Sequence, residues 1–164
     1  MKDQLKTAWE TNNKMNLLFI DQVNDEGMQK SLSSRGGRTV YLQLVHMHNV
    51  RLSWMEIAAK DIFLKYKPLD KETPYDKKAL LKAFEESSKA VEEFIDRNWD
   101  EGGKVKGFKK GLIPMISYLI AHEAHHRGNA MLTLKQSGIK LPDTLNGVYG
   151  SGTSEVIFTQ NYCI

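Results

Sequence analysis

Four long stretches of the chain repeat their apolar residues at steps of three and four, which is the period of an α-helix. They cover about residues 2–22, 39–66, 75–100 and 112–137 of the 164-residue sequence. No sustained alternation of period two, the pattern of a half-buried strand, occurs before residue 140. The sequence therefore predicts an all-α fold, a four-helix bundle, in a single domain spanning residues 1–164.

The ends of these stretches carry helix-breaking signals. Gly36 and Gly37 follow the first stretch, and Pro68 closes the second. Thr73 followed by Pro74 predicts an N-cap and a first helical position for the third. Residues 140–164 are rich in Gly, Ser and Thr, so we expect an irregular tail packed on the bundle. Within it, residues 149–158 are a candidate cover for a cavity.

Charge and composition exclude several classes of function. The net charge of +3 comes from 23 basic and 20 acidic residues, which is too small an excess to predict nucleic-acid binding. The most basic stretch, 104–111, is typical of a solvated loop. The longest apolar run, 112–121, is too short to span a membrane and contains Pro114. A lone Cys163 forms no internal disulfide, and the N-terminus lacks the apolar segment of a secretory signal, so we expect a cytoplasmic protein.

The five histidines fall in two windows, LVHMHNV at 44–50 and AHEAHHRG at 121–128. Residues four apart on a helix project side by side, so His122 and His126 have the spacing of two ligands on one ion. His125 is rotated about 60° from His122 and about 100° from His126, which makes it a weaker candidate for a fourth ligand. The alternative is that these histidines are hydrogen-bonded core residues or solvated surface residues.

A third ligand is expected from another helix, because bundles build metal sites from facing helices. His46 shares a stripe with Leu42, Val50 and Ile57, and we expect that stripe to face inward. His48 lies about 160° around the helix and shares its side with Leu44 and Met55. We therefore choose His46 as the ligand and treat the His48 side as a candidate surface for a partner or for dimerisation.

Three imidazoles with an open coordination position are typical of Zn²⁺, and imidazole also suits nickel. Residues 122–126, HEAHH, also satisfy the H-E-x-x-H motif of metalloproteases, with Glu123 as general base. The elongated form of that motif fails at Asn129. The only later acidic residues, Asp143 and Glu155, lie outside the predicted helices. A protease also needs a sheet edge to hold its peptide, and none is predicted. We regard this as the less favoured alternative.

The two histidine windows together resemble the DinB-like superfamily (DinB/YfiT), a group of small metal-binding four-helix bundles. The segment VHMHNV resembles the family context of the first histidine, with Asn49 and Val50 placing it at His46. The segment HEAHHRGN resembles the second element, with Arg127 and Gly128 after His126. Asn129 stands where glutamine is common in the family. The resemblance covers about residues 1–140.

The resemblance implies a divalent metal ion, zinc or nickel, held by His46, His122 and His126. It also implies a small-molecule substrate and a homodimer. The reaction remains open between a thiol S-transferase using a low-molecular-weight thiol and a hydrolase using water. A non-catalytic metal-binding, stress-response protein that acts through a partner is the alternative. Candidates for the surroundings of the metal are Asn49, Ser53, Trp54, His125, Arg127 and Asn129, with Asn12 and Asn16 as further cavity candidates.

Overall fold

The computed structural model describes residues 1–33 and 37–146. Within them the chain is all-α, as the sequence predicts, and no strand is present. Four long helices make up most of the fold: α1 (Lys2–Gln22), α3 (Val40–Ala58), α5 (Lys77–Asp100) and α6 (Leu112–Gln136). Three short helices, α2 (Asp25–Met28), α4 (Lys60–Phe63) and α7 (Asp143–Asn146), lie between or after them.

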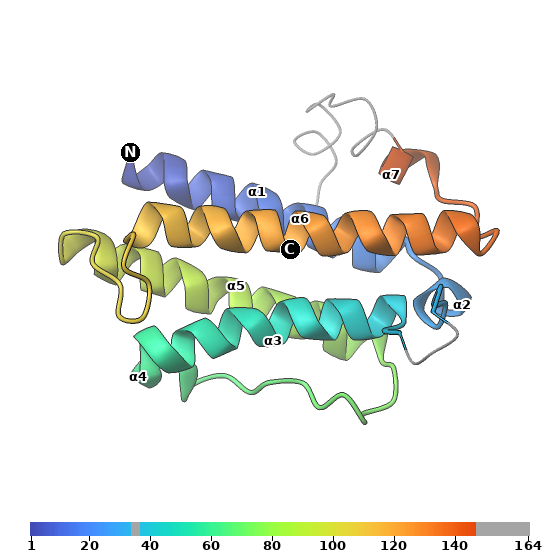
Figure 1. Cartoon of the computed structure of the whole chain (residues 1–164), viewed down its shortest axis with the longest axis horizontal. Helices are drawn as coiled ribbons and strands as arrows, with labels where there is room; N and C mark the ends of the chain where they lie inside the picture. The colour runs from blue at the N-terminus through green and yellow to red at the C-terminus, as the bar shows by residue number, and fades with distance from the viewer. Residues whose placement is uncertain (34–36, 147–164) are drawn as a thin grey trace.

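The long helices lie side by side along one axis (Figure 1). Helix α6 contacts both α1 and α3, and α5 contacts the same two helices from the other side. Helices α3 and α6 run in opposite directions, whereas α3 and α5 run in the same direction. The connection from α4 to α5 therefore crosses back along the length of the bundle (Figure 1).

Two helix boundaries differ from the prediction. The second helix ends at Ala58 rather than near residue 66, because Ala59 leaves the helical region with φ −154° and ψ 66°, and the short α4 follows. Helix α5 begins at Lys77, with Asp76 rather than Thr73 as its N-cap. The Asp76 carboxylate accepts hydrogen bonds from the backbone N–H groups of Lys78 and Ala79. An aspartate in this position satisfies two donors that the first turn leaves free.

The inward face of α3 is not the one predicted. Ile57 is 48% exposed, and Leu42, His46 and Val50 are only half-buried. The opposite side is buried instead, including Leu44, Met47, His48, Arg51, Leu52 and Met55. Apolar and polar residues are mixed around the circumference of α3, so the period alone did not determine which side packs inward.

Among the described residues, the core consists of two apolar clusters, one at each end of the bundle. One contains Phe19 and Phe84, and the other contains Trp9 and Phe94. Between them along the helices come buried polar residues from all four long helices: Asn12, Asn13 and Asn16 on α1, Arg51 on α3, Ser87 on α5, and Glu123 and Arg127 on α6. We call this set the polar layer. It lies at the level of the histidines of α6, because Glu123 follows His122 directly.

Two segments outside the four long helices add further observations. The 104–111 segment is not simply solvated, since Val105 is buried and Phe108 packs against the core. The tail forms α7 at 143–146, and the candidate cover at 149–158 lies outside the described residues. Among the described helices, none combines the length and the apolar character that crossing a bilayer requires.

Candidate metal centre

Three histidines from two helices converge where α3 and α6 pack together. His46 comes from α3, and His122 and His126 come from successive turns of α6. One ring nitrogen of each lies within 4.8 Å of those of the other two. The ring centroid of His46 is 5.3 Å from that of His122 and 4.9 Å from that of His126. The two histidine windows, more than seventy residues apart in sequence, thus form one cluster that could hold a metal ion.

The spacing of the nitrogens suits a transition metal. The Nε2 atoms of His122 and His126 are 3.2 Å apart. Two nitrogens bound to one zinc ion at about 2.0–2.1 Å with a tetrahedral angle would be about 3.3 Å apart. The three rings could therefore ligate one ion with little rearrangement, and three protein ligands leave at least one coordination position open.

The surroundings keep the histidines neutral. Burial, followed by the positive charge of Arg38, lowers the pKa of His46 from 6.5 to about 4. Burial and the neighbouring histidines lower the pKa of His126 to about 4. Burial also lowers the pKa of His122. Neutral imidazole is the form that binds metals, so the cluster is ready to act as a ligand set at neutral pH.

In two histidines of the cluster, the ring nitrogen that faces away from the other histidines has no hydrogen-bond partner in the described part of the chain. These are the buried Nδ1 atoms of His122 and His126. Metal-bound histidines commonly donate this N–H to a carboxylate or carbonyl. Here Tyr118 stacks on the His122 ring, with centroids 5.9 Å apart and planes inclined by 29°, and the His125 ring lies 5.2 Å from the His126 ring between centroids.

Glu123, next to His122, points into the polar layer and is fully buried. Its Oε1 accepts a hydrogen bond of 2.6 Å from Nε of Arg51, and its Oε2 accepts one of 2.9 Å from Nη2 of the same side chain. Oε2 also accepts bonds of 2.6 and 2.7 Å from Asn12 and Asn16. The Arg51 guanidinium, which lies over the rings of Trp9 and Phe84, holds the pKa of Glu123 low despite the opposing effect of burial.

The polar layer extends through Arg127, one turn along α6 from Glu123. Its Nη1 donates to the side-chain oxygens of Asn12 at 2.8 Å and Asn16 at 2.6 Å. The carboxamides of α1 thus bridge an acid and a base of α6. These directional bonds fix the rotation of α6 against α1 and α3, which is the rotation that aims His122 and His126 at His46.

This geometry argues against the H-E-x-x-H alternative. A general base must reach the substrate or a water beside the metal. The Glu123 carboxylate is instead enclosed by Arg51 and two asparagines on the core side of α6. Arg127, Asn12 and Asn16 likewise hydrogen-bond to one another within the polar layer.

The proposed surface around His48 is wrong. His48 is 1% exposed, and Leu44 and Met55 are fully buried, so this side of α3 offers no docking face. The Nε2 of His48 lies 3.2 Å from the carbonyl oxygen of Lys67, in the connection that crosses back along the bundle. Asn49 bonds the same connection twice, through the backbone N–H and carbonyl of Leu69. Both side chains therefore anchor that connection to α3.

The remaining candidates lie on the outer side of the cluster. Ser53 is exposed and donates to the carbonyl of Asn49. His125 is exposed, its Nε2 lies 2.9 Å from the Asn129 side-chain nitrogen, and it stands outside the three-histidine group. Trp54 is half-buried and contacts the rings of Phe108 and Tyr118.

Sequence reasoning missed three residues near the cluster: Tyr118, Phe108 and Arg38. Tyr118 precedes His122 by four residues, and this helical spacing could have identified it. Nothing local to the sequence marks Phe108, because it reaches Tyr118 only through the fold of its loop. Arg38 precedes the N-cap Thr39, and only the structure brings its charge near all three histidines.

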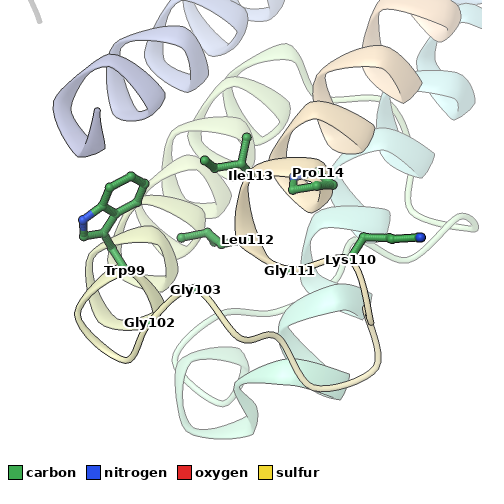
Figure 2. A pocket seen from close by; sticks show the side chains of 8 residues that line it. All are labelled: Trp99, Gly102, Gly103, Lys110, Gly111, Leu112, Ile113 and Pro114. Carbon is green, nitrogen blue, oxygen red and sulfur yellow. The ribbon is translucent and has the colours of Figure 1, made fainter.

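A separate pocket of about 390 Å³ opens where α5 turns into α6 (Figure 2). Trp99, Leu112, Ile113 and Pro114 line it together with Lys110 and three glycines. None of the predicted site residues lies in it, so it is distinct from the histidine cluster.

Comparison with known proteins agrees with this architecture. The crystal structure of a DinB-like protein from Bacillus cereus ATCC 10987 matches with a TM-score of 0.62 and 18% sequence identity, covering 85% of this chain and 95% of that one. At this identity the match shows the fold. No curated protein matches the sequence. The model of the DinB family matches residues 1–151, which is most of the chain. The protein therefore belongs to the DinB family.

Proposed function

We propose that the protein is a metal-dependent enzyme acting on a small molecule, with His46, His122 and His126 holding a divalent ion, zinc or nickel. The observation that carries the proposal is the convergence of three neutral imidazoles, one nitrogen of each within 4.8 Å of the others. Ligand sets of three histidines with an open position are typical of catalytic rather than structural metal sites.

A bound ion at this centre would lower the pKa of a coordinated thiol or water and so supply a nucleophile at neutral pH. The protein's own residues hold the ligands in place and restrict which side of the cluster is accessible. Glu123 and Arg51 close the core side with a buried ion pair. Tyr118 flanks His122 on α6, and half-buried His46 forms the α3 side of the histidine cluster. Both a thiol S-transferase and a hydrolase are compatible with this arrangement.

The metal site is tested by elemental analysis of the untagged protein after loading with zinc or nickel and dialysis. We expect close to one ion per chain in the parent and a loss of most of it in His46→Ala, His122→Ala and His126→Ala. His125→Ala is the matched control, since it removes an imidazole from the same helix outside the cluster. Equal metal in the parent and in His46→Ala would contradict the proposal.

The reaction class is then tested with the loaded protein. A thiol S-transferase would consume a low-molecular-weight thiol together with an electrophile such as 1-chloro-2,4-dinitrobenzene, and a hydrolase would cleave esters or amides without added thiol. In either case His46→Ala should lose the rate and His125→Ala should retain it. A rate that survives in His46→Ala would show that the cluster does not carry the activity.

A further inference from the structure

Three aromatic side chains form a continuous surface beside the histidine cluster. Tyr118 on α6 stacks on His122. Trp54 on α3 lies 6.0 Å from Tyr118 and 5.5 Å from Phe108, and Phe108 lies 6.1 Å from Tyr118, between ring centroids. We call Trp54, Phe108 and Tyr118 the aromatic wall. It extends from the cluster toward the end of α3.

The aromatic wall lies at the edge of the core. Tyr118 is 41% exposed and belongs to neither core cluster, whereas Trp54 and Phe108 are half-buried and pack against the cluster that contains Trp9 and Phe94. The loop that carries Phe108 is held close to α3 by Gly107, which has φ +81°. A Cβ at this glycine would lie 2.6 Å from Cγ2 of Ile57. The fold thus holds an apolar, partly solvated surface in contact with a proposed metal ligand.

Positive charge lies on the other side of the cluster. Arg38 precedes α3, about two helical turns before His46, whereas Trp54 lies about two turns after it. Arg38 and Lys71 are both exposed, and the positive charge of each contributes to lowering the pKa of His46. The charge of Arg38 also contributes to lowering the pKa values of His122 and His126. A ligand centred on the cluster would therefore have a flat apolar surface on one side and cations on the other.

We propose that the metal centre takes a small amphipathic acid: a coordinating group at the histidines, an aromatic or other flat apolar group against the aromatic wall, and an anionic group toward Arg38 and Lys71. This proposal rests on the proposed function and specifies its substrate class. Aromatic groups gain from edge and offset contacts with other rings beyond simple burial. The anion is attracted by the two cations through solvent, so that attraction weakens with salt.

The test uses the full chain loaded with Co²⁺ and three thiols. The compound 2-mercapto-3-phenylpropanoate carries a thiol between a carboxylate and a phenyl ring. Its analogue 2-mercaptopropanoate lacks the ring, and 2-phenylethanethiol lacks the carboxylate. Binding to the metal is followed by the thiolate-to-cobalt absorption band. We expect the complete compound to bind about tenfold more tightly than the analogue without the ring, and about threefold more tightly than the analogue without the carboxylate at low salt.

Variants test whether the gain in affinity from the phenyl ring depends on the aromatic wall and whether the gain from the carboxylate depends on the cations. Tyr118→Ala should remove most of the tenfold gain, and the Co²⁺ content of the variant, measured separately, reports whether the metal site is intact. Arg38→Gln should reduce the gain from the carboxylate, and Arg38→Gln combined with Lys71→Gln should remove that gain and its salt dependence. Leu132→Ala, an exposed apolar residue elsewhere on α6, is the control and should change neither.

The outcomes separate the two proposals. If no Co²⁺ binds, or if it binds equally to His46→Ala, the proposed function fails and this inference fails with it. If Co²⁺ binds at the cluster but the phenyl ring gives no gain, or the gain survives in Tyr118→Ala, only the inference is overturned. Bound Co²⁺ with no absorption band for any of the three thiols also overturns the inference.

Discussion

Nε of Arg51 lies 2.6 Å from Oε1 of Glu123, and neither side chain is accessible to solvent beyond 1%. The pair joins α3 to α6 at the level where these helices also bring His46 to His122. A buried ion pair of this kind is stabilising only while both charges and their remaining hydrogen bonds are satisfied. Here asparagines, Ser87 and a backbone carbonyl complete the set.

Arg51→Met should destabilise the protein by about 3–5 kcal/mol, because it leaves Glu123 buried without its counter-charge. The free energy of unfolding is measured by urea denaturation of the metal-free protein. The double variant Arg51→Met/Glu123→Leu should recover part of the loss. Arg97→Met, which breaks the exposed pair with Asp61, is the control and should cost far less. Equal losses in Arg51→Met and Arg97→Met would show that the polar layer does not support the fold.

Metal binding should resist acid better than ordinary histidine ligands do. The pKa values of His46 and His126 are lowered from 6.5 to about 4 and that of His122 is lowered as well, so protons compete with the metal only at a more acidic pH than for free imidazole. We expect the metal affinity to be nearly constant from pH 7.5 to 6 and to fall steeply below about pH 5. Equilibrium dialysis at a series of pH values with metal analysis measures this. An affinity that already falls tenfold between pH 7 and 6 would contradict it.

His48 should make the stability of the metal-free protein depend on pH. Burial lowers its pKa to about 4, whereas the unfolded chain binds the proton near pH 6.5. The unfolded state therefore holds more protons between these values, and stability falls as the pH is lowered from 6.5 toward 4, by about 3 kcal/mol at most. In His48→Phe this slope should be smaller whatever the absolute stability. An unchanged slope in urea denaturation between pH 7 and 5 would exclude His48 as its source.

The loss of stability on replacing Gly107 by Ala can be compared with the loss at a second glycine that has similar backbone geometry. Gly107→Ala should destabilise the protein by more than the roughly 1 kcal/mol expected for a left-handed backbone, because its Cβ also meets Ile57. Gly102 has φ +80°, and a Cβ added there would meet no atom within 4 Å, so Gly102→Ala should show the backbone effect alone. Thermal unfolding of both variants gives the comparison. Equal midpoints would mean that the loop adjusts and that the contact with α3 is not tight.

Much of this architecture was predictable because helices are local structures. The bounds of α1 and α6 follow from apolar periodicity, and a four-residue step places His122 beside His126 in any helix. Boundaries that depend on longer-range contacts were less accurate. The break at Ala59 and the N-cap at Asp76 belong to a connection that is anchored to α3 by His48 and Asn49.

The choice between His46 and His48 shows what only tertiary structure decides. The sequence correctly paired His46 with the histidines of α6, but through a stripe of α3 that proved to be half-exposed. Apolar and polar residues are mixed around the whole circumference of α3, so its own residues do not determine its rotation. That rotation follows from Arg51, whose charge is buried only where Glu123 of α6 meets it. The sequence by itself determined the helices and the paired histidines, whereas long-range pairing of buried polar groups decided which faces meet and where the three-histidine cluster lies.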